Sequence, residues 1–167
     1  GWQLAGRATG DAEGQPVRVD YAISTDQIWQ THRVSVSMST EHPPSHQHCV
    51  LERDDQGHWT AHGEDCPSLD AIQGLQDIDI QITPASNTLP INRLNLAIGE
   101  GSEVTAAWVR IPEFEVEPLR QRYTRVASRT YNYESSDGEF TATLEVDDLG
   151  LVTTYDPGWT RIASTNE

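Results

Sequence analysis

The chain has 167 residues, the length of one domain, with 36% apolar residues and 11 basic against 26 acidic side chains, a formal net charge of −15. No apolar run is long enough to cross a membrane as a helix. The acidic excess disfavours a role in binding nucleic acid or an anionic membrane surface, because both need clustered cations. All the basic residues are arginines, which suits either a high-salt cytoplasm or a GC-rich genome.

Alternating apolar and polar residues predict β-strands along most of the chain. The clearest alternations cover residues 17–23, 32–38, 77–83, 104–108 and 139–146. One buried and one wet face is typical of antiparallel sheets. Glycine-containing turn signals at residues 54–57, 136–138 and 148–150 predict hairpins, which join 49–53 to 58–62, 131–135 to 139–146, and that last strand to 151–155.

Helical signals are scarce. Residues 68–75 carry apolar side chains at helical spacing behind a candidate cap, Ser68, and predict one or two turns. The proline-bearing residues 41–45 predict a loop, and residues 83–92 a structured crossing between strands. The sequence therefore predicts one all-β domain over residues 1–167, with about ten to thirteen short strands. So many strands must stack as a sandwich or close into a barrel or roll, whose interior could hold a ligand.

Two groups of polar residues raise the question of catalysis or metal binding. His46 and His48 share one strand face, but a metal site needs three or four ligands, so surface histidines are the better interpretation and no metal is expected. Asp77 and Asp79 share a face about 7 Å apart and could support glycoside hydrolysis, although acids alternating with isoleucine usually form the wet face of a strand. No nucleophilic triad or phosphate loop is present.

The two cysteines, Cys49 and Cys66, could close a loop of about 16 residues as a disulfide. Two cysteines in a domain of this length are ordinary usage, so free thiols are the expectation. The first residues contain neither a charged start nor an apolar run, so no signal peptide is expected, although a removed leader is an open alternative.

One segment resembles a known family. Residues 77–94, with the motif Thr-Pro-x-x-Asn-Thr-Leu-Pro and a following Arg-Leu, are similar to the signature of the bacterial putative glycolipid-binding family, formerly a domain of unknown function. Supporting matches are Gln121-x-Tyr123, Tyr131-x-Tyr133, Gly138-x-Phe140 and the stretch 146–155. The resemblance implies a spiral β-roll, an incomplete antiparallel barrel with at most one or two short helices. It also implies a cytoplasmic location and a likeness to lipoprotein carriers of the bacterial envelope.

The resemblance further implies a binding or carrier protein for a lipid-like or glycolipid-like molecule held in the roll interior, without catalysis or cofactor. The motif could serve the fold alone, with Asn87 holding a turn and Arg93 pairing with Asp77 or Asp79. If it also borders the ligand site, Asn87 and Thr88 would offer hydrogen bonds to a head group. The net charge favours a neutral head group. The expected ligand-binding residues are Asp79, Asn87, Thr88, Arg93, Trp108, Tyr123, Tyr131 and Tyr133.

Two other function classes stay open at this point. The domain could be a structural or protein-interaction module without a small ligand, or a hydrolase or isomerase that uses Asp77 or Asp79. An open apolar cavity would favour the carrier, a filled interior with an exposed apolar patch would favour the interaction module, and a polar cleft with convergent carboxylates would favour the enzyme. The sequence leaves the ligand and the oligomeric state open.

Overall fold

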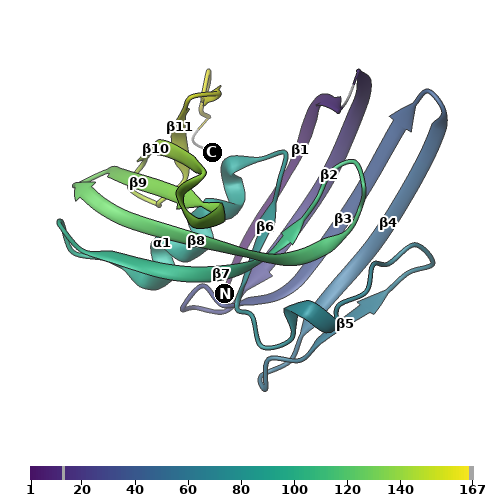
Figure 1. The fold of residues 1–167 in the computed structure, drawn as a ribbon, viewed down its shortest axis with the longest axis horizontal. Coiled ribbons are helices and arrows are strands. Elements are labelled where there is room, and N and C mark those ends of the chain that lie inside the picture. Colours follow the sequence, from purple (N-terminus) through teal and green to yellow (C-terminus); the bar gives the residue numbers. More distant parts are fainter. Residues whose placement is uncertain (13, 166–167) are drawn as a thin grey trace.

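The computed structural model describes residues 1–12 and 14–165, which form two β-sheets (Figure 1). The first sheet is an antiparallel meander of five strands: β1 (Trp2–Ala12), β2 (Gln15–Thr25), β3 (Thr31–Glu41), β4 (Pro44–Arg53) and β5 (Trp59–His62). Its long strands form an open layer in Figure 1. Within this sheet the sequence missed β1, and the predicted loop at residues 41–45 is a tight turn, because β3 and β4 run to its edges.

The second sheet has seven strands and curls into a half-barrel (Figure 1). Its strands are β6 (Asp77–Ile80), β7 (Gly101–Val109), β8 (Val116–Ala127), β9 (Thr130–Ser135), β10 (Phe140–Val146), β11 (Val152–Asp156) and β12 (Trp159–Thr160). All neighbours are antiparallel except β6 and β7, which are parallel. The all-β roll with few short helices is thus confirmed, and the twelve strands of the described residues lie within the predicted number.

The parallel pair depends on the segment between its strands. Parallel neighbours need a crossover connection, and here it contains the 3₁₀ turn η2 (Pro84–Asn87) and the helix α1 (Thr88–Leu94). The backbone N–H of Ala85 donates to the hydroxyl of the extended Thr83, and proline occupies the first helical position. Asn95 ends the helix in the left-handed conformation, with φ of 44°.

The helical segments therefore differ from the sequence prediction in place and in number. The segment that was predicted only as a structured crossing is helical. The predicted helix at residues 68–75 is a single 3₁₀ turn, η1 (Asp70–Ile72), and a third short turn, η3 (Ser136–Gly138), lies in the β9–β10 hairpin. No helix of the described residues has the length and apolar character needed to span a membrane.

Two separate apolar clusters stabilise the fold. The larger one packs the inner face of the first sheet against one face of β6 and β7, and it includes Ile78 and Ile80. The smaller one fills part of the concave side of the half-barrel, where Tyr123 and Leu144 pack with Ile91 of α1. Strand β6 lies between them: Ile78 and Ile80 pack in the larger cluster, Asp77 is buried and Asp79 is partly buried, so the aspartates do not form the wet face that the alternation suggested.

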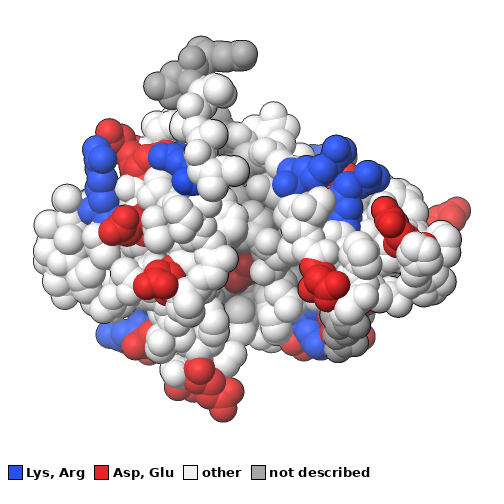
Figure 2. All heavy atoms as spheres, turned by 90° about the horizontal axis from the view of Figure 1, so that it is seen from above, with Lys and Arg blue, Asp and Glu red and all other residues white. Residues whose placement is uncertain are grey.

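Charged side chains lie mostly toward the periphery in the view of Figure 2, and the hollowed centre of that face is built mainly of uncharged residues. Many of the surface charges are paired: Arg120, for example, lies 3.1 Å from the carboxylate of Asp137 and 3.7 Å from that of Glu103. Exposed pairs of this kind contribute little each to stability.

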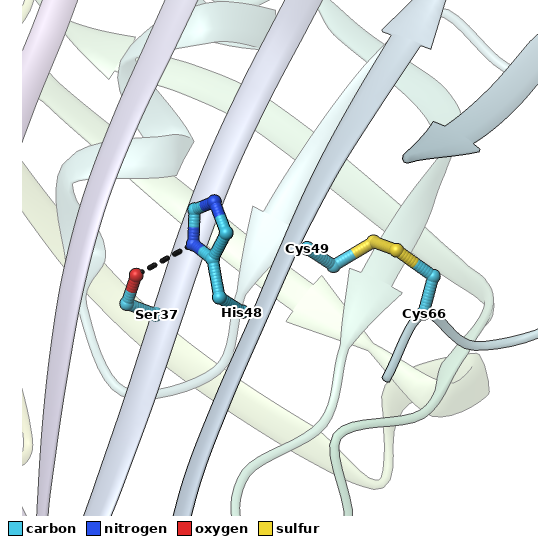
Figure 3. Close-up of a disulfide and its surroundings, with 4 residues drawn as sticks. All are labelled: Ser37, His48, Cys49 and Cys66. Carbon is cyan, nitrogen blue, oxygen red and sulfur yellow. Dashed lines mark hydrogen bonds between the residues drawn. A yellow bond between two sulfur atoms is a disulfide. The ribbon is translucent and has the colours of Figure 1, made fainter. Parts of the chain in front are cut away.

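The expectation of free thiols was wrong, because Cys49 and Cys66 form a disulfide (Figure 3). Cys49 points from β4 into the core, and the bond ties this strand to the segment that follows β5. His48 points to the opposite face, where its Nδ1 lies 2.7 Å from the Ser37 hydroxyl, and the neighbouring His46 contacts Ser39 in the same way. The described residues contain no cluster of three or more metal-ligating side chains.

Candidate ligand-binding pocket

A pocket of about 500 Å³ lies within the curl of the second sheet. Strands β7 to β12 and the segment from β6 to η2 all contribute to its wall. The volume is in the usual range for sites that hold a small molecule. The lining residues are Asp79, Gln81, Ile82, Thr83, Pro84, Asn87, Trp108, Leu119, Tyr133, Ser135, Ser136, Phe140, Tyr155, Pro157, Gly158 and Trp159.

Aromatic rings form much of this wall. Tyr133, Phe140 and Tyr155 make a triangle, with ring centroids 6.1 to 6.2 Å apart. Phe140 is 42% exposed and Trp159 is 40% exposed, so both belong to the open side of the pocket. We call Trp108, Tyr133, Phe140, Tyr155 and Trp159 the aromatic wall. Large exposed rings around a concavity are typical of sites for amphipathic ligands, since ring faces bind both alkyl chains and the apolar faces of sugars.

A chain of hydrogen bonds forms the polar part of the pocket. Asn87 Nδ2 donates to the Tyr123 hydroxyl (2.9 Å), which donates to Gln121 Oε1 (3.2 Å). The Nε2 of the same glutamine donates to Asp79 Oδ2 (2.5 Å), and the Ser86 hydroxyl donates to Asp79 Oδ1 (3.0 Å). The Asp79 carboxylate is thereby held by one donor on each oxygen while it also faces the pocket.

The environment of Asp79 shifts its ionisation. Burial raises the pKa of the Asp79 carboxyl to about 6, although the hydrogen bonds from Ser86 and Gln121 favour the charged form. Burial also raises the pKa of Tyr123, Tyr133 and Tyr155, and the nearby Asp79 carboxylate adds to each increase. Around neutral pH the pocket therefore holds neutral phenols and one largely ionised carboxylate.

Asp77, two residues earlier on the same strand face, has a different partner. Its side chain is only 1% exposed and forms a bidentate ion pair with Arg93 of α1, whose Nε lies 3.1 Å from Asp77 Oδ1. The sequence left the partner of Arg93 open between the two aspartates, and the structure pairs it with Asp77. Since Asp77 does not line the pocket, Asp79 is the one carboxylate among the lining residues.

The structure brings four of the eight expected binding residues together. Asp79, Asn87, Trp108 and Tyr133 line the pocket. Tyr123 is fully buried behind them and connects Asn87 to Gln121.

The other three lie elsewhere. Thr88 is fully buried in α1, where its hydroxyl has no hydrogen-bond partner among the described residues, and Arg93 is tied to Asp77. Tyr131 packs in the smaller apolar cluster with the Arg125 guanidinium 5.7 Å from its ring centroid.

The expected binding residues do not include five residues of the site: Ser86, Gln121, Phe140, Tyr155 and Trp159. Gln121, Phe140 and Tyr155 are parts of the motifs that carry the family resemblance, which was the available signal. Ser86 could have been placed from the cap at Thr83 and Pro84, because a helical turn beginning there directs it back toward β6, where Ile80 N donates to its hydroxyl (3.2 Å).

Comparisons with known proteins agree with this architecture. A crystal structure of a DUF1089 family protein from Pseudomonas aeruginosa superposes with a TM-score of 0.82 at 33% sequence identity, covering 96% of this chain and 91% of that one. No curated protein matches this chain. The model of the family described as "putative glycolipid-binding" matches residues 1–161. This chain therefore belongs to the putative glycolipid-binding family.

Proposed function

We propose that this protein is a binding or carrier protein that holds a lipid-like or glycolipid-like ligand in the pocket of the half-barrel and catalyses no reaction. The observation that carries the proposal is the composition of the pocket: aromatic rings on the open side and, among the lining residues, one charged group, the hydrogen-bonded carboxylate of Asp79. A ligand with an apolar part and a polar end matches this division. The family description supports a binding role.

The residues divide into two proposed roles. Asp79 and Asn87 would contact the polar end of the ligand, and Trp108 and Tyr133 would flank the apolar part together with the other rings of the aromatic wall. Gln121 and Tyr123 would keep the polar groups oriented, since each is fixed by hydrogen bonds at both ends. Arg93 would act indirectly by holding α1 against β6.

The energetics of such a ligand are adequate without a strong ionic anchor. Each buried methylene contributes about 0.8 kcal/mol, so an eight-carbon chain brings roughly 6 kcal/mol before the cost of immobilisation, and millimolar binding needs a net gain of about 4 kcal/mol. Anionic head groups are disfavoured by the net charge of −15 and by the Asp79 carboxylate.

A hydrolase that uses the two aspartates is less consistent with the structure. Glycosidases place two carboxyl groups on either side of the scissile bond. Here Asp77 is buried in its pair with Arg93, and Asp79 alone reaches the pocket. The raised pKa of Asp79 is a property of acid–base catalysts, but a single carboxyl without a partner or nucleophile in the described lining supports binding better than hydrolysis.

An interaction module is the second candidate, and one patch favours it. Trp2 is 48% exposed and stacks on Trp29 with ring centroids 5.0 Å apart, next to the exposed side chain of Ile28. This apolar patch belongs to the first sheet and its β2–β3 connection, and none of its residues lines the pocket. The two candidates therefore depend on different residues and can be separated by mutation.

The compartment is part of the proposal. We expect a cytoplasmic location from the family resemblance, whereas a disulfide such as Cys49–Cys66 is more usual in oxidising compartments. Thiol labelling in cells of the native host decides between them: labelled cysteines support the cytoplasm, and blocked cysteines support an oxidising compartment.

The test of binding is calorimetric titration with octyl β-glucoside below its micelle concentration. We expect saturable binding with a Kd below about 1 mM. Trp159→Ala should weaken it about tenfold or more, because it removes a ring from the aromatic wall. Trp2→Ala is the matched control, since that tryptophan is similarly exposed and lies outside the pocket.

Absence of saturable binding of octyl β-glucoside below about 1 mM would overturn the carrier proposal. Equal weakening by both tryptophan substitutions would place the binding outside the pocket and would count against it as well. Loss of ligand binding in Trp159→Ala alone, with the same unfolding midpoint as the wild type, supports it.

A further inference from the structure

The residues that line the pocket carry one negative charge and no positive charge. Of the sixteen residues that line it, Asp79 alone carries a formal charge. Its two hydrogen bonds come from uncharged donors, the hydroxyl of Ser86 and the amide of Gln121. Among the described residues, no Arg or His side chain forms an ion pair with Asp79, whereas the equally placed Asp77 has Arg93. A carboxylate held in a partly buried position without a countercharge costs free energy.

The basic residue associated with the pocket wall does not supply that charge. The Arg110 guanidinium lies over the Trp108 ring, 5.6 Å from its centroid. It is already surrounded by three carboxylates, those of Glu113 at 3.0 Å, Glu115 at 3.6 Å and Glu117 at 3.7 Å. Arg110 is therefore more than neutralised by its own neighbours, and it does not belong to the lining of the pocket.

The aromatic wall suits a cation as well as an alkyl chain. The faces of Trp, Tyr and Phe rings are electron-rich and attract ammonium groups, with about 2 kcal/mol or more where the groups are desolvated. Five such rings surround a space that also contains one carboxylate. The rings and the carboxylate therefore favour the same kind of group, whereas they would disfavour an anion.

The carboxylate has capacity for such a ligand. Each oxygen of an ionised carboxylate can accept about two hydrogen bonds. In this structure Asp79 Oδ1 accepts one from Ser86 and Oδ2 accepts one from Gln121, so acceptor positions are left while the side chain lines the pocket. The two existing bonds fix the orientation of the group before a ligand arrives, which reduces the entropic cost of binding.

We infer that the polar end of the ligand carries an ammonium group, which donates a hydrogen bond to the Asp79 carboxylate and lies among the rings of the aromatic wall. This inference rests on the proposed carrier function and deepens it, because it replaces an unspecified polar end by a cationic amine. It predicts selection by charge: cationic amphiphiles bind best, neutral ones less well and anionic ones least.

The interaction depends on pH through Asp79. The titratable groups that face it are the phenols of Tyr123, Tyr133 and Tyr155, which stay neutral well above pH 8 because burial raises their pKa. Asp77 on the same strand is compensated by Arg93. Among the residues that line the pocket, Asp79 is therefore the one that changes charge between about pH 5 and pH 8, and affinity for an ammonium should fall as pH drops through about 6.

The experiment compares three ligands with the same alkyl chain: octylammonium, octyl β-glucoside and octanoate. Each is titrated by calorimetry at pH 7.5 and about 0.5 M NaCl, where the Debye length of about 4 Å screens attraction to the overall net charge. We expect octylammonium to bind at least about tenfold more tightly than octyl β-glucoside, and octanoate to bind least. Asp79→Asn should remove the preference, so that octylammonium binds no more tightly than octyl β-glucoside.

A matched control is Glu103→Gln, which removes a carboxylate from the same curled sheet outside the pocket and should leave the preference intact. Retention of the octylammonium preference in Asp79→Asn would overturn the inference, because the preference would then come from net charge. Equal binding of the cationic and neutral ligands in the wild type would overturn it too, while leaving the carrier function supported. If none of the three ligands binds, the carrier function itself fails.

Discussion

The concave side of the half-barrel has two ends that are built from the same strands, and each end contains an aspartate in a different environment. At one end α1 covers the sheet, the apolar cluster around Leu144 fills the space, and Asp77 is neutralised by Arg93. At the other end the space is left open as a pocket, and Asp79 has hydrogen bonds but no countercharge from the part of the chain that the structure describes. The comparison separates an aspartate whose charge is compensated within the fold from one that faces an open pocket.

The difference follows from where the short helix lies. It places Arg93 against Asp77, whereas the preceding turn η2 places the Ser86 hydroxyl against Asp79. A bidentate pair with a guanidinium satisfies a buried carboxylate both electrically and geometrically. Ser86 and Gln121 give the Asp79 carboxylate hydrogen bonds but no positive charge. Stability measurements on matched variants can therefore separate the two aspartates.

The largest effect is expected for Arg93→Met, which keeps a side chain of similar length but leaves the Asp77 carboxylate buried without a countercharge. Removing one partner of a buried pair costs about 3 to 5 kcal/mol of unfolding free energy. The control is Arg120→Met, which removes an exposed arginine with two carboxylate neighbours and should cost less than about 1 kcal/mol. Chemical denaturation at pH 7 measures both, and equal losses would contradict the distinction between a structural and a surface pair.

Asp79→Asn is expected to change stability in the opposite direction. The folded state raises the pKa of this carboxyl from 3.8 to about 6, so the folded protein binds the proton more tightly than the unfolded chain does. Its contribution to stability is therefore present below about pH 4 and is lost as pH rises through about 6. The variant should be more stable than the wild type by up to about 3 kcal/mol at pH 7 and equal to it near pH 4.

The asparagine can also replace the hydrogen bonds of Asp79. Its amide oxygen would accept from Gln121, and its nitrogen would donate to the Ser86 hydroxyl, which can turn toward the Thr83 carbonyl oxygen 3.4 Å away. Unfolding free energies at several values of pH, with Asp77→Asn as the comparison, test this. Destabilisation by Asp79→Asn at pH 7 would show that the pocket carboxylate stabilises the fold after all.

The same two aspartates show what the sequence could and could not predict. Period-2 alternation placed β6 and put both carboxylates on one face, and this is how the structure has them. Alternation indicates that the two faces of a strand differ, but not which element covers the polar face. In β6 the covering of the polar face depends on α1, a helix from the next segment of the chain. The sequence does contain signals for that helix: Thr83 followed by Pro84, typical of a helix start, and Asn95, a residue type common at helix ends.

Tyr131 and Tyr133 give a second case of the same limit. Both lie on one face of β9, as the spacing predicts, and both belong to the smaller apolar cluster. Tyr133 lines the pocket, whereas Tyr131 lies under Arg125 at the filled end. Which of two equivalent rings lines the pocket is decided by the position of α1 along the curled sheet, a tertiary relation that no single strand encodes.

The smallest effect is expected from salt, and it distinguishes surface charge from the buried pair. A net charge of −15 makes the compact state repel itself, and added salt screens that repulsion. Raising NaCl to about 1 M should raise the unfolding midpoint by a few degrees, equivalent to about 1 kcal/mol. The deficit of Arg93→Met relative to the wild type should stay constant over the same range, because a buried pair is screened much less than surface charges.

A variant that neutralises the exposed Asp55, Glu64 and Asp65 should respond less to NaCl than the wild type, which separates screening from general effects of the salt on apolar burial. A wild-type midpoint that stays flat or falls would contradict the surface contribution, whereas a salt-dependent Arg93→Met deficit would show that the Asp77 end of the half-barrel is accessible to solvent ions and is not the closed counterpart of the pocket.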